Sequence, residues 1–495
     1  MAVACGDAFT TIVTEEGDAW ACGNGEDGHL GLGDNAHQLL PSHVGGREVC
    51  IEPLVMVSAG KRHTAGVAKD GAIWCWGSGD YGQLGYGDRE PRQRPKRLGR
   101  EIFGGSSAVM VACGGVHMLV LTAVGLVWSC GRGANGRLGH RDMADQLLLT
   151  PVAAFLCERF GVAQIVMVAA GGCHSVALGV EGRVWTWGYS YHGQLGHNER
   201  QDRLVPTQIA GEALGGSAAV LVGAGGCHSV AVMIDGALWV WGYGRYGQLG
   251  LGDATNRLVP VRVGADEAFG ASPVLMATCG NLHTLAVTQA GTLWAWGQGL
   301  AGKLGHNDEN NRLMPTQVEA QHFGHAKIVS TAAGYDHSAA VTEHGSLYTW
   351  GDGRRETDKD DEDNADDEDD ESDESDEEEI EVSTGLGHGD GEIKLVPTLV
   401  APALLQGARV GRCHGLPTLL ALAFAMGNHS RLGRAAQTAP AAVDNCRDCG
   451  YVSMPGELVQ RIVEACGVWP EGRAGELKGI VRLLGGGMID ERGST

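Results

Sequence analysis

The chain has 495 residues, of which 43% are hydrophobic and 79 are glycine, and its formal net charge at pH 7 is −23. Because the glycines follow no collagen-like period, this composition excludes a fibrous chain and predicts an ordered protein rich in turns. The N-terminus MAVACGDAFTTIVTEE has no basic segment followed by an apolar one, and the longest apolar run, residues 416–426, is too short to span a bilayer. We therefore expect an intracellular protein, in the cytoplasm, the nucleus or both, that is not secreted and has no membrane partner.

One unit is repeated along most of the chain. Each copy contains a Gly-x-x-His motif, here called the anchor motif, and successive anchor glycines are 54 to 57 residues apart, except for a last interval of 77. The anchor histidines are His63, His117, His174, His228, His283, His337 and His414, and the first copy has Phe9 in their place. Such a period is typical of units that stack around a ring or along a rod.

Within each copy the pattern predicts strands. Residues 228–242, HSVAVMIDGALWVWG, read as two short strands with apolar alternation around an Asp-Gly turn. The second strand carries the motif Trp-x-Trp-Gly, which is followed by Leu-Gly-x-x-Asp/Glu and then by a proline. One hairpin cannot bury both of its apolar faces, whereas sheets stacked radially bury both and place the tryptophans between them. The sequence therefore favours an all-β propeller.

The motifs Gly-x-x-His, Trp-x-Trp-Gly and Gly-Gln-Leu-Gly, which recur in register, resemble those of the regulator of chromosome condensation repeat family. The resemblance implies a seven-bladed β-propeller with four short antiparallel strands per blade, over residues 1–437. The anchor at His414 is followed by a degenerate copy without tryptophan, AFAMGNHSRLG at residues 423–433, so eight blades remain the alternative. Residues 438–495 change in character, and the spacing of their apolar residues predicts a small, partly helical C-terminal extension.

Repetition also guides the interpretation of the side chains that recur in each copy. A catalytic group is needed once, so histidines at seven equivalent places are interpreted as structural anchors of the blades. In five copies the acid after Leu-Gly is followed four residues later by a base, which predicts loop-ordering ion pairs. Most of the fourteen cysteines replace small core residues or tryptophan, so we expect no disulfide framework. Cys446 and Cys449 form a Cys-x-x-Cys pair without a second pair at suitable spacing, and we expect no metal and no cofactor.

The largest departure from the repeat is an acidic insertion in the seventh copy, residues 352–383. Its first thirty residues hold twenty acids and three bases, which leaves a net charge of about −6 for the rest of the chain. This composition predicts a disordered loop, either a solubilising spacer or a binding loop for basic partners such as histones. The candidate binding residues are Asp360, Asp361, Glu362, Asp363, Asp369, Asp370, Glu371, Glu377, Glu378 and Glu379. Phosphorylation of the candidate sites Ser372 and Ser375 would deepen the charge, and like-charge repulsion argues against direct DNA binding.

A second departure is a basic cluster in the second copy, REPRQRPKRLGR at residues 89–100. Three interpretations stay open: a solvated loop, a nuclear-import-like signal, and a patch that pairs with the protein's own acidic insertion. The candidate patch residues are Arg92, Arg94, Lys96, Arg97 and Arg100.

The third departure is Asp336, the acid that directly precedes the anchor histidine His337. The equivalent residues in the other copies are Ala8, Arg62, Val116, Cys173, Cys227, Leu282 and Cys413. The resemblance implies that members which exchange nucleotide on the nuclear-transport GTPase present acidic and histidine side chains on one propeller face. Asp336 and His337 are therefore candidate GTPase contacts, and the alternative is that Asp336 is an exposed loop acid.

Two functions follow from these observations. The first is a protein-binding scaffold that uses blade-connecting loops and the acidic insertion. The second, implied by the resemblance, is a guanine-nucleotide exchange factor for a small GTPase of the nuclear-transport type. No phosphate-binding loop, dinucleotide motif or nucleophile elbow is evident, so we expect protein partners and no small-molecule substrate. Family members that sense ultraviolet-B light place tryptophan directly after the anchor glycine, and Lys61, Gly172 and Tyr335 are among the residues found there instead.

Overall fold

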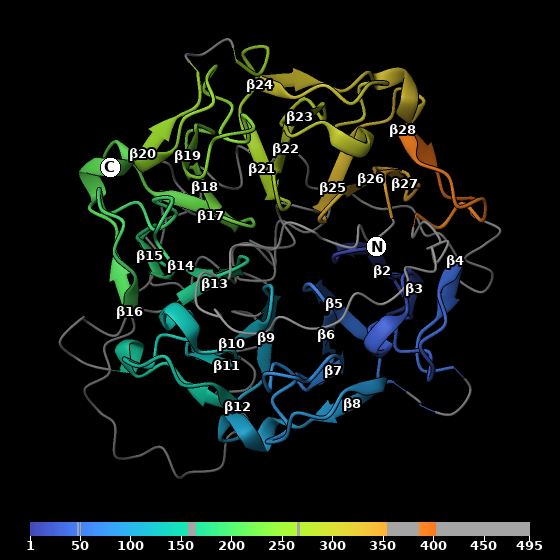
Figure 1. Ribbon diagram of the computed structural model, residues 1–495, viewed down its shortest axis with the longest axis vertical. Coiled ribbons are helices and arrows are strands. Elements are labelled where there is room, and N and C mark those ends of the chain that lie inside the picture. The colour runs from blue at the N-terminus through green and yellow to red at the C-terminus, as the bar shows by residue number, and fades with distance from the viewer. Residues whose placement is uncertain (47–48, 50, 157–164, 265–267, 354–385, 402–495) are drawn as a thin grey trace, which may run out of the picture.

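The computed structural model describes residues 1–46, 49, 51–156, 165–264, 268–353 and 386–401. These residues form seven four-stranded antiparallel sheets arranged as blades around a central axis, as Figure 1 shows. The described residues therefore confirm the predicted seven-bladed β-propeller. The anchor at His414, the degenerate eighth copy and the predicted helical extension lie outside the described residues.

Each blade is one repeat, and its four strands follow one another from the axis outward. Blade 1 contains β1 (Ala2–Cys5), β2 (Phe9–Val13), β3 (Ala19–Gly23) and β4 (Gln38–His43). Blade 2 contains β5 (Leu54–Ala59), β6 (His63–Ala68), β7 (Ile73–Gly77) and β8 (Arg92–Leu98). Blade 3 contains β9 (Ala108–Cys113), β10 (His117–Thr122), β11 (Val127–Gly131) and β12 (Gln146–Pro151). Blade 4 contains β13 (Ile165–Ala170), β14 (His174–Gly179), β15 (Val184–Gly188) and β16 (Arg203–Gln208).

The remaining blades repeat this order. Blade 5 contains β17 (Ala219–Ala224), β18 (His228–Met233), β19 (Leu238–Gly242) and β20 (Arg257–Arg262). Blade 6 contains β21 (Val274–Cys279), β22 (His283–Thr288), β23 (Leu293–Gly297) and β24 (Arg312–Gln317). Blade 7 contains β25 (Ile328–Ala333), β26 (His337–Thr342), β27 (Leu347–Gly351) and β28 (Lys394–Leu399). Short 3-10 helices lie in the connections: η1 (Glu26–Gly28), η2 (Arg100–Phe103), η3 (Ala134–Gly136), η4 (Ala153–Leu156), η6 (Gly211–Leu214), η7 (Leu300–Gly302) and η8 (Ala320–Phe323).

The anchor histidines bridge neighbouring blades. In blade 5 the Nε2 atom of His228 lies 3.0 Å from the hydroxyl of Thr284 in blade 6, and that hydroxyl donates a 2.8 Å hydrogen bond back to the carbonyl of Gln248 in blade 5. Equivalent histidine–hydroxyl contacts join His117 to Ser175, His174 to Ser229, His283 to Ser338 and His337 to Thr10. The seam between blades 1 and 2 lacks the histidine because Phe9 occupies its place. In the next seam His63 has no hydroxyl opposite it, because Met118 stands at the Ser/Thr position.

The second tryptophan of the Trp-x-Trp-Gly motif reaches the same carbonyl. The indole Nε1 of Trp296 donates a 2.9 Å hydrogen bond to the carbonyl of Gln248, beside the hydroxyl of Thr284. Trp76, Trp187, Trp241, Trp296 and Trp350 are all fully buried. Their rings fill the space between adjacent sheets, so the predicted position of the tryptophans is confirmed.

The anchor glycine is required by this packing. A Cβ atom on Gly225 would lie 2.4 Å from Cε1 of His228 and 2.5 Å from the carbonyl oxygen of Gly280 in the next blade. Neither neighbour has room to move, because the imidazole is buried and the carbonyl belongs to the next anchor motif. The anchor motif therefore requires glycine at its first position, because the histidine ring packs closely against its own loop.

In the part of the chain that the structure describes, the ring closes without exchange of a strand between the first and last blades. Blade 7 is complete at Leu399 and lies beside blade 1 (Figure 1). The seam uses the same contacts as the others: the amide of Tyr335 donates to the carbonyl of Gly6 at 3.2 Å, and at the rim the amide of Gly389 donates to the carbonyl of Leu39 at 3.1 Å. Closure therefore depends on non-covalent contacts of the kinds that also join most other neighbouring blades.

Two isosteric substitutions test the histidine–hydroxyl bond. Thr284→Val removes a hydroxyl that serves His228 and the Gln248 carbonyl, whereas Thr64→Val removes one that donates to the His29 carbonyl opposite Phe9. Both carbonyls keep their tryptophan donors. Because Thr284→Val alone leaves a buried imidazole N–H unpaired, we expect it to lower the free energy of unfolding by about 2–4 kcal/mol, against about 1 kcal/mol for Thr64→Val. Equal losses in chemical denaturation would show that the histidine bond contributes nothing.

Candidate protein-interaction face

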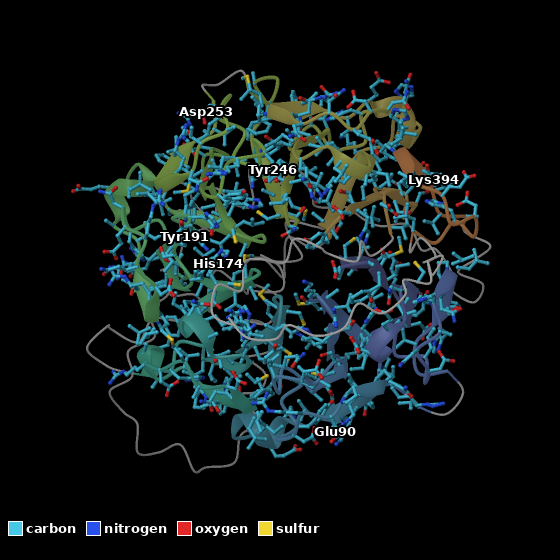
Figure 2. All side chains as sticks on the ribbon, in the orientation of Figure 1. Glu90, His174, Tyr191, Tyr246, Asp253 and Lys394 are labelled. Atoms are coloured by element: carbon cyan, nitrogen blue, oxygen red, sulfur yellow. The ribbon has the colours of Figure 1, made fainter. Side chains whose placement is uncertain are left out.

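The strand register places two sets of loops at one end of the propeller. His174, which begins β14, pairs with Gly188, which ends β15, and His337 pairs with Gly351 in the same way in blade 7. Each anchor loop and the loop that follows the third strand of the same blade therefore lie side by side. We call this end of the propeller the anchor face, and Figure 2 labels two of its loop residues, Tyr191 in blade 4 and Tyr246 in blade 5.

The acidic insertion leaves the propeller from the anchor face of blade 7. It follows β27, which ends at Gly351, and the repeat resumes at Leu386. The hydroxyl of Thr349 donates a 2.7 Å hydrogen bond to the carbonyl of Leu386, as Thr186 does to Leu195 in blade 4. The insertion therefore interrupts the loop of blade 7 without shifting the repeat on either side of it. The ten candidate binding acids, Ser372 and Ser375 lie outside the described residues.

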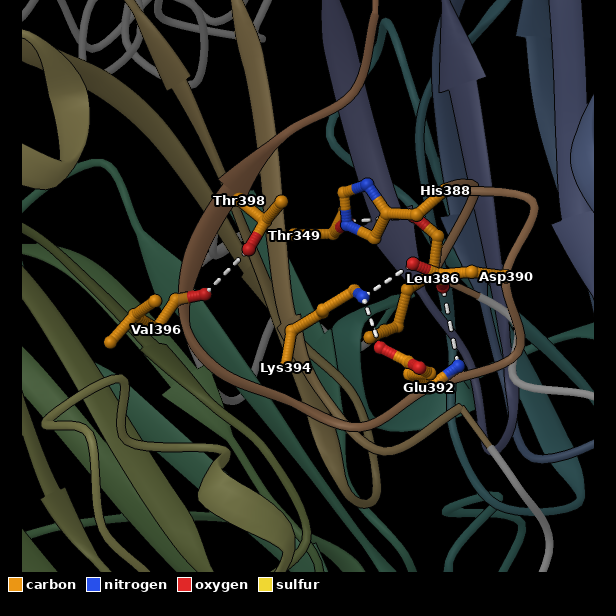
Figure 3. A network of polar contacts seen from close by, with 8 residues as sticks. All are labelled: Thr349, Leu386, His388, Asp390, Glu392, Lys394, Val396 and Thr398. Carbon is orange, nitrogen blue, oxygen red and sulfur yellow. Dashed lines mark hydrogen bonds and ion pairs between the residues drawn. The ribbon is translucent and has the colours of Figure 1, made fainter.

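Polar contacts fix the point where the chain returns from the insertion (Figure 3). His388 Nε2 lies 2.9 Å from the hydroxyl of Thr349, and the ammonium of Lys394 lies 2.5 Å from Asp390 and 3.3 Å from Glu392. Asp390 also accepts the backbone amide of Glu392 at 3.2 Å. The ion pair holds the pKa of Asp390 below its usual value, although burial opposes this shift. The blade 7 loop is thus fastened immediately after the acidic segment.

The five predicted loop-ordering ion pairs are all present. Asp390 and Lys394 form one of them, and the others join Asp88 to Arg92, Glu199 to Arg203, Asp253 to Arg257 and Asp308 to Arg312. All of these side chains are partly exposed, so each pair adds little to stability. Their effect is to define the shape of the loops.

The candidate contact Asp336 lies in a buried ion pair. Its residue is 9% exposed, and its carboxylate pairs with the ammonium of Lys303, which is 1% exposed. Lys303 also donates a 2.7 Å hydrogen bond to the side-chain oxygen of Gln298. The alternative interpretation of Asp336 as an exposed loop acid is therefore wrong: Lys303 of blade 6 reaches across the seam and covers it. Its candidate role as a GTPase contact stays a prediction.

Sequence reasoning missed Lys303, although the signal was available. Residues 82–85, 193–196 and 247–250 read Gly-Gln-Leu-Gly, and the same motif at residues 302–305 reads Gly-Lys-Leu-Gly. Where glutamine is present, as at Gln248, its side-chain oxygen accepts a backbone amide of its own loop. A lysine at this buried place needs a carboxylate, and the acid before the next anchor histidine supplies it.

The other candidate contact, His337, is fully buried and lies 3.0 Å from the hydroxyl of Thr10. For anchor histidines elsewhere in the ring, the hydrogen bond that the opposite hydroxyl donates shows which imidazole nitrogen carries the proton. Ser229 has one hydroxyl hydrogen and donates it to the carbonyl of Gln194, so it accepts from Nε2–H of His174. Burial lowers the pKa of His174 to about 3 and that of His228 and His337 to about 4. These imidazoles are therefore neutral at pH 7, and those of His174 and His228 donate hydrogen bonds to the hydroxyls of the next blade.

The basic cluster forms a strand rather than the loop that its composition favours. Residues 92–98 are β8, the outer strand of blade 2. Arg92 pairs with Asp88 at 2.6 Å, Arg97 pairs with Asp70 at 2.6 Å, and Lys96 lies over the ring of Tyr86. An outer strand is free at one edge, which accommodates Pro95 and keeps the long charged side chains near solvent. Much of the positive charge of the candidate patch is therefore neutralised by acids of the same blade.

The guanidinium of Arg94 packs against Gly33 of blade 1, and Arg100 is exposed at the start of η2.

Among the described residues, no group of three or more His, Cys, Asp or Glu side chains has the arrangement of a metal site. Within the same residues the structure contains no helix that is both long and apolar enough to cross a membrane.

Comparison with known proteins identifies the family. A family model described as the RCC1-like domain matches residues 1–220 and 54–414. The chain belongs to the RCC1-like domain family. The ultraviolet-B receptor UVR8 of Arabidopsis thaliana is 38% identical over 299 residues, which cover 60% of this chain and 65% of the receptor. The human E3 ubiquitin-protein ligase HERC2 is 31% identical over 352 residues, which cover 70% of this chain and 7% of the ligase.

Solved structures show the same RCC1-like fold. Human WBSCR16 superimposes with a TM-score of 0.60 and 26% identity, over 69% of this chain and 86% of that chain. Prp20p of Saccharomyces cerevisiae superimposes with a TM-score of 0.62 over 79% of this chain and 87% of that chain. Its identity is 22%, so this likeness concerns the fold alone.

The buried histidines predict acid sensitivity. In the unfolded chain each imidazole binds a proton near pH 6.5, whereas the folded state holds the pKa of His228 and His337 at about 4. The unfolded state therefore binds more protons between these values, and stability falls as the pH falls from about 6.5 to 4. We expect a loss of about 1.4 kcal/mol per pH unit for each such histidine, measured by denaturant titration across this range. A flat profile would mean that the histidines titrate normally in the folded protein.

A double-mutant cycle tests the buried ion pair. Asp336→Cys leaves the Lys303 ammonium buried without its carboxylate, and we expect a loss of about 3–5 kcal/mol in the free energy of unfolding. Adding Lys303→Gln reproduces the residues of the seam between blades 4 and 5, Gln194 and Cys227. The double variant should therefore recover most of the loss. Additive costs in the double variant would argue against coupling between the two side chains.

Proposed function

We propose that this chain is a protein-binding propeller that captures basic protein segments on its anchor face. The observation that carries the proposal is the placement of the acidic insertion. Twenty acids in thirty residues enter the chain at one loop of one face, and the repeat is in register on both sides of them. A concentrated negative charge attracts a positively charged partner and accelerates its encounter with the face.

The relatives support protein partners in general terms. The solved structure of Prp20p is described together with its binding properties to Gsp1p and histones. A second solved structure shows Kap60 bound to yeast RCC1 (Prp20). In the basic cluster, Arg92 and Arg97 are paired with acids of their own blade, and the chain outside residues 352–381 has a net charge of about −6. This distribution favours a basic protein over nucleic acid as the partner.

Removal of the insertion tests the proposal. We expect purified core histones to bind the full chain at 50 mM salt and to lose at least ten-fold in affinity when residues 354–383 are deleted. A second variant with the acids of residues 360–379 changed to Asn or Gln keeps the length and removes the charge, and it should match the deletion. Fluorescence anisotropy across a salt series measures both. Unchanged affinity in the two variants would reduce the insertion to a spacer.

Guanine-nucleotide exchange on a small GTPase of the nuclear-transport type is the second candidate function. It follows from the family resemblance, and the Lys303–Asp336 ion pair, which is mostly buried, is the departure on the anchor face that the exchange hypothesis would use. Exchange needs no proton-transfer site, because the exchange factor acts by stabilising the nucleotide-free GTPase.

Release of labelled GDP from the nuclear-transport GTPase tests the second candidate. We expect the full chain to accelerate release and the Lys303→Gln/Asp336→Cys variant to lose this effect, because it lacks the acid. The double variant separates contact from stability better than Asp336→Ala, which leaves Lys303 unpaired. No acceleration by the full chain would exclude the second candidate and leave the scaffold.

A further inference from the structure

The anchor face carries a continuous chain of aromatic rings over blades 4 and 5. In blade 4, Tyr191 stacks on Tyr189 with ring centroids 6.3 Å apart and an interplanar angle of 15°, and His192 lies 5.0 Å from Tyr191. His192 crosses the seam and lies 4.6 Å from Tyr243 of blade 5, which is followed by Tyr246 at 6.1 Å. We call these five residues the tyrosine cluster.

The tyrosine cluster is at least partly exposed to solvent, whereas the second tryptophans of the Trp-x-Trp-Gly motifs are fully buried. Tyr191 is 54% exposed, and the other four members are half-buried. Its members come from the loops that follow β15 and β19, the places equivalent to the entry point of the acidic insertion after β27. Tyr191 and Tyr246 lie on neighbouring blades in Figure 2. The cluster and the insertion thus share one face of the propeller.

Cationic side chains of this chain already lie over tyrosine rings of the propeller. The guanidinium of Arg200 lies 5.6 Å from the ring centroid of Tyr191. At two further places on the anchor face, Arg132 lies over Tyr81 at 5.0 Å and Lys61 lies over Tyr335 at 5.9 Å. A ring face attracts a cation electrostatically, and a planar guanidinium also stacks on it, which an ammonium does not do.

We propose that the tyrosine cluster binds arginine side chains of the basic segment captured by this face. The inference rests on the proposed function, because the acidic insertion supplies the long-range attraction and the cluster supplies the preference for guanidinium over ammonium. The chain's net charge of −23 makes a basic occupant the complementary one. Stacked rings spread over two blades offer several adjacent positions, which suits a segment with closely spaced arginines.

Two labelled peptides test the inference on the full chain. One alternates arginine with glycine over twelve residues, and the other has lysine in place of every arginine. We expect the arginine peptide to bind at least five-fold more tightly in fluorescence anisotropy. The Tyr191→Leu/Tyr246→Leu variant keeps apolar side chains but removes two rings, and its ratio of affinities should fall close to one. Tyr191→Phe/Tyr246→Phe keeps the rings and should retain the preference.

Controls separate this inference from the function on which it rests. Met314→Ala changes a residue of the outer strand β24 that is 59% exposed, and it should leave both affinities unchanged. Deletion of residues 354–383 should weaken both peptides by the same factor and leave the ratio intact.

Four results would overturn the inference. Equal affinity of the wild-type chain for the two peptides, or a preference that survives in the leucine variant, would overturn it and leave the proposed function standing. A wild-type dimer in light scattering that becomes a monomer in the leucine variant would show that a second copy occupies the cluster. Failure of the wild-type chain to bind either peptide would overturn the proposed function as well.

Discussion

One carbonyl oxygen in each typical seam brings together the motifs that define the repeat. The carbonyl of Gln248, from the Gly-Gln-Leu-Gly segment of blade 5, accepts the hydroxyl of Thr284 and the indole N–H of Trp296, both from blade 6. The same hydroxyl accepts from His228 of blade 5. Four segments that are distant in sequence therefore meet at one point. Every partner is buried, and the hydroxyl of Thr284 is the group on which the others depend most, because its loss leaves the imidazole N–H of His228 without an acceptor in the interior.

This arrangement explains why the repeated side chains carry so little functional information. A neutral imidazole whose Nε2 atom contacts a hydroxyl of the next blade has the same structural task in five of the seven seams between the described blades. The candidate functional residues are therefore side chains that differ between equivalent positions. Lys303 with Asp336, the tyrosine cluster and the insertion after β27 are such departures, and all of them belong to the anchor face.

Much of the fold could be predicted from the sequence because the repeat encodes it locally. The hairpin at residues 228–242 appears as β18 and β19, and the acid-to-base spacing of four residues appears as five ion pairs. The predictions were weaker where a residue's role depends on the neighbouring blade. Asp336 reads as an exposed acid until Lys303 is placed across the seam. The cluster at residues 92–98 reads as a loop because charge hides the strand pattern of an outer edge.

The tyrosine cluster also could not be predicted from the sequence, because it depends on contacts between neighbouring blades. Tyr189, Tyr191 and His192 are close in sequence, but Tyr243 joins them only because equivalent loops of adjacent blades lie next to each other. A repeat alignment gives the equivalence of the two loops. It does not give the stacking, which depends on the twist and spacing of the blades.

The absence of strand exchange at the seam between blades 7 and 1 has a consequence for the order of the blades. Each blade is a continuous stretch of chain, and the seam between blades 7 and 1 is built from the same kinds of contact as most of the others. The fold thus does not depend on which blade is made first. A circularly permuted chain, opened between two other blades and joined across this seam, would retain every interblade contact described above. In such a ring the order of synthesis and the geometry of the finished molecule are independent, because each described blade is completed by strands of its own repeat.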